Sequence, residues 1–302
     1  MAELIGIGIV GVGKIVRDQH LPALAADPGY RLVAAASRHG KVDGIPNFAT
    51  IEAMLEAVPG LDAVCLCMPP QFRYDAARAA LAAGKHVFLE KPPGATVSEV
   101  EHLKALAAEK GLSLFASWHS RYAPAVEAAR TFLASARLRS AAIDWKEDVR
   151  RWHPNQDWIW MPGGFGVFDP GINALSIATY IFPAMRIVSA ELDFPGNREA
   201  PIAAHVAFRT ADGTAVRMEL DWRQTGPQSW DIAAETDRGS MLLSGGGARL
   251  AIDGKVVHEE REAEYPALYR RFAELVREGR SDADLAPLQH VADAFMLGRR
   301  NV

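Results

Sequence analysis

The sequence predicts an α/β fold in two parts: an N-terminal doubly wound parallel sheet and a C-terminal α+β part with a large, mostly antiparallel sheet. Three observations predict it. Short apolar segments alternate with helical patterns up to about residue 120, a glycine-rich turn follows the first segment, and segments with alternating polarity dominate later. A chain of 302 residues can form two separate cores. We therefore expect domains at 1–120 and 121–302.

The composition is that of an ordinary globular protein, with 49% hydrophobic and 23% charged residues. The net charge of -4, without long blocks of one sign, argues against a nucleic-acid surface. No apolar segment is long enough to span a membrane, and glycines interrupt the first apolar run, which is not typical of a signal peptide. We expect a cytoplasmic protein with small-molecule partners, binding neither nucleic acid nor membrane.

The two cysteines, Cys65 and Cys67, lie in one apolar run at 63–68. Successive side chains of a strand point to opposite faces, so we expect the two thiols not to pair. Buried thiols in a reducing compartment are typical of structural residues. We predict no metal site; a metal or redox role is the alternative.

A glycine turn follows the strand predicted at 4–10. Gly11 and Gly13 open a G-x-G-x-x-G/A pattern in which Val16 stands at the third small position. Gly11 allows a tight turn, and Gly13 lets the backbone approach a pyrophosphate at a helix N-terminus. A turn without ligand is the alternative. We expect cofactor contacts from Gly11, Val12, Gly13, Lys14 and Ile15.

The second predicted strand, at 31–36, ends in Ser37, Arg38 and His39. A site specific for NAD would place an acidic side chain here to bind the ribose 2′-hydroxyl. Arg38 instead suits a 2′-phosphate. The cofactor prediction is therefore NADP, with NAD also accepted, and the alternative is an arginine in a solvated loop.

The remaining elements of the N-terminal part are helices at 52–58, 74–83 and 98–110 and strands at 63–68, 87–89 and 112–116. Ser98 with Glu101 forms a capping pattern for the third helix. Ligands of parallel sheets bind at the carboxyl ends of the strands. We therefore expect further cofactor contacts at two strand ends, from Cys67, Met68, Pro69, Pro70, Glu90 and Lys91.

After a helix at 125–136 and a strand at 138–145, a loop follows that is rich in tryptophan. Four of the seven tryptophans lie here: Trp145, Trp152, Trp158 and Trp160. An indole beside polar groups suits a sugar, whose C–H face is apolar and whose rim carries hydroxyls. Packing in a core is the alternative for each indole.

Asp169 and Asn173 open a helix that we expect to run to about residue 181. Their spacing of four places them on one helix face. The alternative for Asp169 is an N-cap. Strands at 202–208, 214–222 and 230–235 alternate in polarity, and amphipathic helices at 265–278 and 287–300 close the chain. A sheet face without helices would be a homodimer surface.

The motifs in order resemble the glucose–fructose oxidoreductase and inositol dehydrogenase family of two-domain NAD(P)-dependent oxidoreductases. They are Gly11-x-Gly13, His20-Leu21-Pro22, Glu90-Lys91-Pro92, His119-x-Arg121-Tyr122, and Gly163-Gly164 with Asp169-x-Gly171. Segments 17–23, 146–154 and 168–175 look most like members that oxidise L-arabinose or D-galactose. The resemblance implies a dinucleotide-binding first domain, a second domain for substrate binding and dimerisation, and oxidation of an aldopyranose at C1 to the aldonolactone.

The resemblance also implies site residues. Many members carry a histidine base where this chain has Asn173, and an amide cannot accept a proton at neutral pH. We favour Asp169 as acceptor of the anomeric proton, with Lys91 orienting that hydroxyl; Lys91 as the base is the alternative. Asn173 would hold a ring hydroxyl. Further sugar contacts carried over are Glu147, Trp152 and His153, and His119 would lie near the nicotinamide or the sugar.

Two other functions fit the same motifs. One is a related dehydrogenase for another sugar, a polyol or an aryl dihydrodiol. The other is a non-catalytic sugar or dinucleotide sensor, which would have little need to combine Lys91 with Asp169. Turnover of NADP+ with a panel of aldoses separates these classes.

Overall fold

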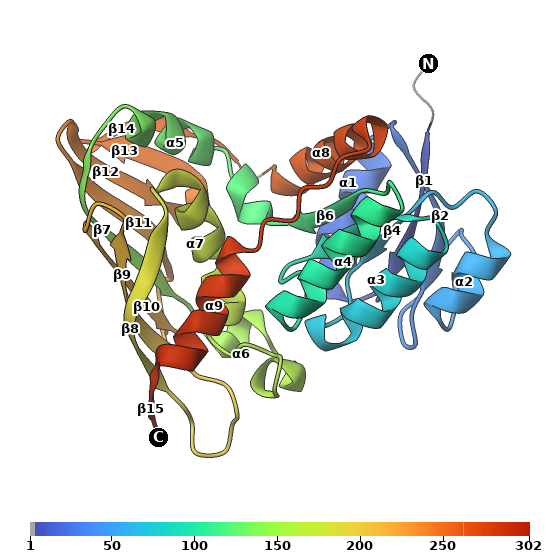
Figure 1. Cartoon of the computed structure of the whole chain (residues 1–302), viewed down its shortest axis with the longest axis horizontal. Helices are drawn as coiled ribbons and strands as arrows, with labels where there is room; N and C mark the ends of the chain where they lie inside the picture. The colour runs from blue at the N-terminus through green and yellow to red at the C-terminus, as the bar shows by residue number, and fades with distance from the viewer. Residues whose placement is uncertain (1–3, 262) are drawn as a thin grey trace. The chain divides into compact units, whose positions relative to one another are not determined.

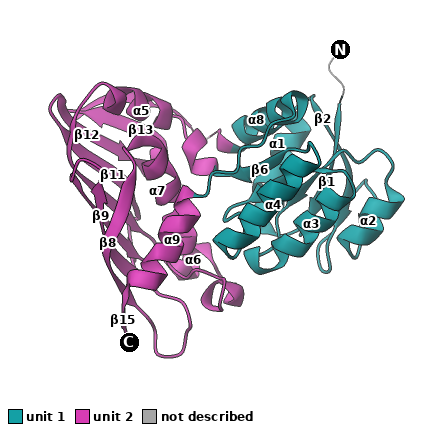
Figure 2. Ribbon diagram, viewed as in Figure 1, with its two compact units in different colours: residues 1–118, 265–285 teal, residues 119–264, 286–302 magenta. Residues whose placement is uncertain are grey.

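The computed structural model describes residues 4–261 and 263–302, and the chain divides into two compact units (Figures 1 and 2). Unit 1 contains residues 1–118 and 265–285, and unit 2 contains 119–264 and 286–302. The chain first passes from unit 1 to unit 2 between residues 118 and 119, close to the expected boundary at 120. Residues 265–285, which we expected in the second domain, pack in unit 1 because aromatic side chains of this segment meet the sheet. The ring centroids of Tyr269 and Phe272 lie 5.3 and 5.5 Å from that of Phe88.

Unit 1 is built on a six-stranded parallel sheet of order β3-β2-β1-β4-β5-β6. Its helices are α1, α2, α3, α4 and α8. This confirms the predicted doubly wound sheet, and the reversal of strand order at β1 and β4 creates the crevice where such sheets bind ligands. The strands are β1 (Ile5–Val10), β2 (Tyr30–Ala36), β3 (Asn47–Phe48), β4 (Ala63–Leu66), β5 (His86–Glu90) and β6 (Leu114–Ser117), and the helices are α1 (Leu21–Ala26), α2 (Ile51–Ala57), α3 (Arg73–Ala82), α4 (Val97–Glu109) and α8 (Glu264–Glu278).

Two details of unit 1 differ from the sequence predictions. Helix α4 is capped by Thr96 and Glu99 rather than by Ser98 and Glu101, because the Thr96 hydroxyl accepts from the Glu99 N–H and the Glu99 carboxylate accepts from the Thr96 N–H.

The Sγ atoms of Cys65 and Cys67 lie 3.5 Å apart. Our expectation that these side chains diverge was wrong, because residues two apart in an extended segment share a face.

Unit 2 is built on a nine-stranded sheet of order β14-β13-β12-β11-β7-β10-β9-β8-β15. Only the β7–β10 and β8–β15 pairs among these named strands are parallel, which confirms the mostly antiparallel prediction. The strands are β7 (Leu138–Lys146), β8 (Met185–Asp193), β9 (Ala203–Thr210), β10 (Ala215–Asp221), β11 (Ser229–Thr236), β12 (Gly239–Ser244), β13 (Arg249–Ile252), β14 (Lys255–Glu259) and β15 (Arg299–Asn301).

Helices α5 (Val126–Ala134), α7 (Phe168–Ile181) and α9 (Ala286–Leu297) cover one face of this sheet (Figure 1). The last helix ends earlier than expected, and the strand β15 takes its final residues. Val216, Met218 and Leu220 point toward the helices and are buried, as their alternation predicts. The opposite face carries no helix among the described residues. None of the described helices has the length and apolar character needed to cross a membrane.

Candidate active site

The glycine turn of unit 1 has the geometry of a dinucleotide cradle. Gly11 has a φ of +89°, and a Cβ there would lie 2.6 Å from the backbone nitrogen of Met68. Glycine is therefore required at this position. A Cβ on Gly13, in contrast, would meet nothing within 4 Å. The exposed backbone that follows Gly11 thus leaves room for a pyrophosphate, and the residues present fit the predicted cofactor.

The other expected contacts in this turn divide between surface and core. Gly13, Lys14 and Ile15 are exposed, whereas Val12 and Val16 are buried. Val16 occupies the third small position of the pattern, and the chain is π-helical from Val16 to His20 before α1 begins at Leu21. The side chain of Ile15 is exposed to a ligand, that of Lys14 is paired with the Asp18 carboxylate at the surface, and the buried Val12 packs against the loop at Gly40.

The end of β2 lies against the glycine turn. A Cβ on Gly40 would come 2.2 Å from the carbonyl oxygen of Val12, so the loop at 37–40 is in close contact with the turn. The Ser37 hydroxyl accepts from the Gly40 N–H at 3.2 Å. Arg38 and His39 are exposed, and the Arg38 guanidinium lies 5.8 Å from the centroid of Phe72. A cation beside the turn suits a phosphate on the ribose.

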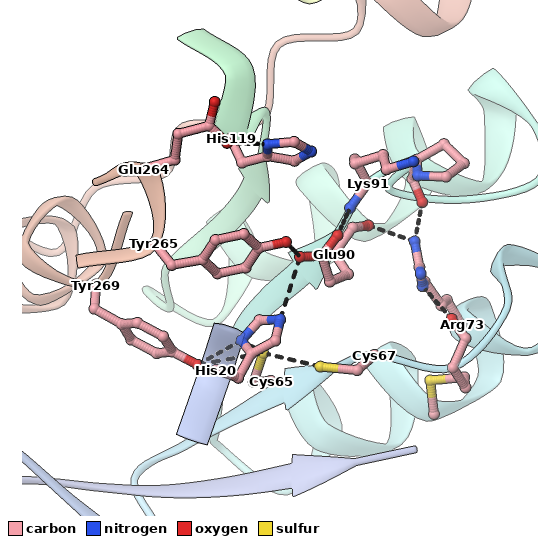
Figure 3. Close-up of polar contacts among 12 residues, drawn as sticks. His20, Cys65, Cys67, Arg73, Glu90, Lys91, His119, Glu264, Tyr265 and Tyr269 are labelled. Atoms are coloured by element: carbon pink, nitrogen blue, oxygen red, sulfur yellow. Dashed lines mark hydrogen bonds and ion pairs between the residues drawn. The ribbon is translucent and has the colours of Figure 1, made fainter. Parts of the chain in front are cut away.

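Arg73, a residue that the sequence analysis did not single out, joins two of the expected strand ends. Its buried guanidinium donates to the carbonyl oxygens of Met68, at 2.7 Å, Glu90 and Pro92 (Figure 3). It therefore holds the backbone after β4 and the backbone on both sides of Lys91 in one arrangement. An arginine at the start of an alanine-rich helix carries no sequence signal for this role.

Glu90 is the centre of a buried polar network (Figure 3). Its Oε1 accepts from the Tyr265 hydroxyl at 2.7 Å and lies 3.2 Å from Nε2 of His20, and its Oε2 accepts from the backbone N–H of Lys91 at 2.7 Å. Burial lowers the pKa of His20, but its contacts with Cys67 and Glu90 outweigh this and raise it to about 10. The Glu90 carboxylate thus positions the Lys91 backbone, and a cofactor contact from Glu90 stays a prediction.

In unit 2, a tight turn leads into helix α7 and places Asp169. Phe165 and Gly166 have φ values of +64° and +54°, and a Cβ on Gly166 would lie 2.3 Å from the Pro201 carbonyl oxygen. The left-handed conformation of Phe165 is strained for a bulky residue. The N-cap of α7 is Val167, so the alternative of Asp169 as an N-cap is wrong. Asp169 stands in the first turn and is only 3% exposed.

His153 lies between two carboxylates of unit 2. Its Nε2 is 3.6 Å from Oδ2 of Asp169 and 3.7 Å from Oε1 of Glu147. On the other side of the ring, Nδ1 lies 3.4 Å from Oε1 of Gln156. Three residues that the sequence analysis named separately are therefore brought together, and we call His153, Glu147 and Asp169 the His153 centre.

Two indoles hold the Glu147 carboxylate. Oε1 accepts from Nε1 of Trp222 at 3.3 Å and Oε2 from Nε1 of Trp230 at 3.0 Å, and Glu147 is 5% exposed. The ring of Trp152, which is 39% exposed, stands 5.6 Å from that of Trp230. The sequence analysis gave Trp222 and Trp230 no role. Both reach Glu147 because β7 lies between β11 and β10, an order that the sequence does not show.

The other predicted residues of unit 2 have varied settings. Asn173 stands one turn after Asp169, half-buried, and among the described residues its side-chain amide makes no hydrogen bond. His119 is paired through Nδ1 with the Glu264 carboxylate (Figure 3), a partner that we did not predict. Trp145 is buried in β7, so the packing alternative is correct for this tryptophan.

The parallel sheet with its glycine turn in unit 1 and the His153 centre in unit 2 are typical of a dinucleotide-dependent enzyme with a separate substrate domain. Residues 5–117 match the family described as an oxidoreductase family with an NAD-binding Rossmann fold, GFO_IDH_MocA. The predicted resemblance is therefore confirmed: the chain belongs to this family, and it is an NAD(P)-dependent oxidoreductase.

Among individual relatives, the chain is 45% identical to a galactose 1-dehydrogenase of Pseudomonas fluorescens over 98% of this chain and 96% of that one. A crystal structure of D-galactose-1-dehydrogenase from Rhizobium etli is 66% identical, with a TM-score of 0.96 over 100% of this chain and 97% of that chain. A 3-ketoreductase from Actinomadura kijaniata, solved with TDP-benzene and NADP, shares the fold at 20% identity, with a TM-score of 0.85 over 99% of each chain.

Proposed function

We propose that the protein oxidises D-galactose and L-arabinose at C1 to the corresponding aldonolactones, with NADP+ as the preferred hydride acceptor and NAD+ also accepted. The observation that carries the proposal is the His153 centre: two buried carboxylates around one imidazole, next to an exposed indole. The near full-length similarity to proteins named for galactose oxidation supports the choice of sugar.

The His153 centre and its surroundings have the chemistry of a sugar site. Carboxylate oxygens accept hydrogen bonds from hydroxyls, and the amide of Asn173 can both donate and accept. The exposed face of Trp152 offers an apolar surface for the C–H groups of a pyranose. The 3.6–3.7 Å separations between Nε2 of His153 and the two carboxylates are longer than hydrogen bonds. Sugar hydroxyls can therefore enter between the imidazole and these carboxylates without breaking a short contact between them.

In the proposed reaction, Asp169 accepts the proton of the anomeric hydroxyl. The bound nicotinamide supplies the acceptor for the hydride that leaves C1, and the C1–O bond becomes the lactone carbonyl. Loss of the hydroxyl proton builds negative charge on the oxygen, and the Lys91 ammonium stabilises it. Two features support Asp169 as the base: its burial in the first turn of α7, and His153 beside it. Lys91 is the alternative base.

The preference for NADP depends on Arg38. Its exposed guanidinium at the end of β2 lies next to the glycine turn and can bind a 2′-phosphate in a bidentate manner. We expect Arg38→Ala to raise the KM for NADP+ about 10-fold, the loss of roughly one charged hydrogen bond, with little change for NAD+. Steady-state kinetics with both cofactors measure this. Equal effects on the two cofactors would contradict a 2′-phosphate contact.

A panel of aldoses tests the function. Purified protein is mixed with NADP+ or NAD+ and D-galactose, L-arabinose or D-glucose, and cofactor reduction is followed by absorbance. D-Galactose and L-arabinose share their ring configuration and differ by the hydroxymethyl group at C5, so we expect kcat/KM values within about 200-fold of each other. D-Glucose, the C4 epimer of D-galactose, should react much more slowly. Absence of turnover with every sugar would favour the sensor.

We also propose a homodimer that forms through the sheet face of unit 2 without helices. Alanines lie in register across this face, with Ala233 beside Ala142, and Arg217 lies between Ala142 and Ala207. Small residues let two sheets approach closely. Light scattering should give a dimer for the wild type and a monomer for Ala142→Glu, whereas Lys104→Glu on α4 should leave the dimer intact. A monomeric wild type would contradict this proposal.

A further inference from the structure

Three potential metal ligands converge inside unit 1: His20, Cys65 and Cys67 (Figure 3). The two Sγ atoms lie 3.5 Å apart, and Sγ of Cys65 lies 3.6 Å from Nδ1 of His20. All three ligand atoms are within 4.8 Å of one another. His20 and Cys65 are fully buried and Cys67 is half-buried, so the cluster belongs to the interior and not to a flexible surface.

We propose that His20, Cys65 and Cys67 form a binding site for one thiophilic metal ion, with Zn²⁺ as its occupant. Two thiolates and an imidazole are the ligands that zinc prefers in proteins. Zinc–sulfur and zinc–nitrogen bonds of about 2.3 and 2.0–2.1 Å place tetrahedral ligand atoms roughly 3.4–3.8 Å apart. The two shorter separations lie within this range, and the third, at no more than 4.8 Å, would need to close by up to roughly 1.0–1.4 Å.

The surroundings of His20 complete the arrangement of a zinc site. On the side away from the cysteines, Nε2 of His20 faces Oε1 of Glu90 at 3.2 Å. A carboxylate on the far nitrogen fixes the tautomer and orientation of a metal-bound histidine. The Tyr269 hydroxyl is hydrogen-bonded to Nδ1 of His20 at 2.7 Å and lies 3.9 Å from Sγ of Cys65, and a bound ion would replace its hydrogen bond at Nδ1.

The fold brings these ligands together from two segments of the chain. His20 ends a widened π-helical turn, Val16–His20, directly after the glycine turn. Cys65 lies in β4, and Cys67 follows it, with its N–H bonded to the Val10 carbonyl oxygen at 2.8 Å. A bound ion would therefore tie the helix after the glycine turn to the end of β4, and we expect it to stabilise the dinucleotide half of the protein. Its binding releases the proton of each thiol and any proton on Nδ1 of His20.

The test measures metal content and does not depend on turnover. Full-length protein kept in a phosphine reductant is loaded with Zn²⁺, desalted and analysed for metal and protein. We expect about one zinc ion per chain for the wild type and a large loss in Cys67→Ala, whose half-buried position tolerates the change. The matched control is His102→Asn on the surface of α4, which removes an imidazole outside the cluster and should keep the wild-type content. Substitution with Co²⁺ should give a thiolate-to-cobalt charge-transfer band in the wild type but not in Cys67→Ala.

Thermal unfolding is a second measurement. Zn²⁺ should raise the unfolding temperature of the wild type by several degrees and leave that of Cys67→Ala unchanged, because an ion that binds the folded state stabilises it. The proposal is overturned if loaded wild type retains less than about a tenth of a zinc ion per chain, or if Cys67→Ala retains as much as the wild type. Because metal content is independent of the sugar reaction, these outcomes are separate from those of the aldose panel.

Discussion

Each unit contains a cluster in which an imidazole lies near carboxylate groups, and the two clusters differ in the lengths of their polar contacts. In unit 1, the single carboxylate of Glu90 meets the His20 imidazole, a phenol and a backbone N–H at 2.7–3.2 Å. In unit 2, the single imidazole of His153 lies 3.6–3.7 Å from two carboxylates. The first carboxylate is held in one position by short hydrogen bonds. In the second cluster the contacts between imidazole and carboxylates are longer, and the Glu147 carboxylate takes its hydrogen bonds from Trp222 and Trp230. Longer contacts within a cluster leave room for a substrate hydroxyl to bind there.

The difference has a measurable consequence. A hydrogen bond to a charged group contributes about 1.5–3 kcal/mol, and a buried charge that loses its partner costs more. Substitutions around Glu90 should therefore reduce the free energy of unfolding. Substitutions in the His153 centre should instead mainly reduce turnover and should cost less stability than those around Glu90.

The largest expected effect is on the proposed base. Asp169→Asn keeps the shape of the side chain but cannot accept a proton, so we expect kcat to fall about 10²–10⁴-fold, the usual contribution of general base catalysis. Lys91→Met should lower kcat as well, because it removes the charge that stabilises the developing oxyanion. Rapid mixing experiments that follow hydride transfer directly measure both. Near wild-type turnover in Asp169→Asn would move the role of base to Lys91.

The next effect compares two buried glutamates. Glu90→Gln leaves the His20 imidazolium without its anionic partner, and we expect a loss of about 2–4 kcal/mol in the free energy of unfolding. Urea unfolding in the presence of a chelator measures this for the metal-free protein. Glu147→Gln is the matched comparison. Its amide oxygen can still accept from one of the two indoles, Trp222 or Trp230, so it should lose less stability than Glu90→Gln and should raise the KM for the sugar. Equal losses of stability would remove the distinction between the two clusters.

A smaller effect is expected from the imidazole of unit 2. His153→Asn should lower kcat/KM for D-galactose about 10–100-fold, which corresponds to one hydrogen bond to a charged group. The free energy of unfolding should change by less than about 1 kcal/mol, because the contacts of Nε2 with the two carboxylates are 3.6–3.7 Å long. Kinetics and urea unfolding of the same variant give both values. If stability falls while kcat/KM stays constant, His153 is a structural residue.

The smallest effect concerns two carboxylates without an imidazole between them. Asp231 of β11 stands directly opposite Asp144 of β7. Burial, with a contribution from Asp144, raises the pKa of Asp231. A raised pKa favours the folded state below the unfolded pKa, near 3.9, and this advantage is lost as the pH rises through the folded pKa.

The substitution Asp231→Asn should therefore stabilise the protein at pH 7 by a few tenths of a kcal/mol, because both groups are partly solvated. Below about pH 4, where the carboxylates are protonated, the difference should disappear. Thermal unfolding of both proteins between pH 3.5 and 8 measures it. A variant that is less stable at pH 7 would show that Asp231 has a favourable partner instead.

Local patterns were sufficient for most strands of the first sheet and for the central strands of the second, but they did not predict β3, β8 or the strands β12 to β15. The period of the apolar residues predicted both sheets, and the turn at Gly11 follows from a backbone conformation and a contact with Met68 that exclude a side chain. Helix boundaries were less certain, as the cap at Thr96 shows, because two overlapping capping patterns occur within three residues. These are properties of neighbouring residues, which a sequence displays directly.

The sequence by itself therefore determined the fold class, the family and the residue types at the sites, because strand periodicity and glycine turns are local. Only the tertiary structure decided their partners. Tyr265 reaches Glu90 across 175 positions, and Trp230 reaches Glu147 through the order of the strands. Likewise, the thiols of Cys65 and Cys67 became candidate ligands only when the fold placed His20 beside them. Hydrogen bonds and metal coordination depend on distances between atoms, and no local pattern encodes distances across a fold.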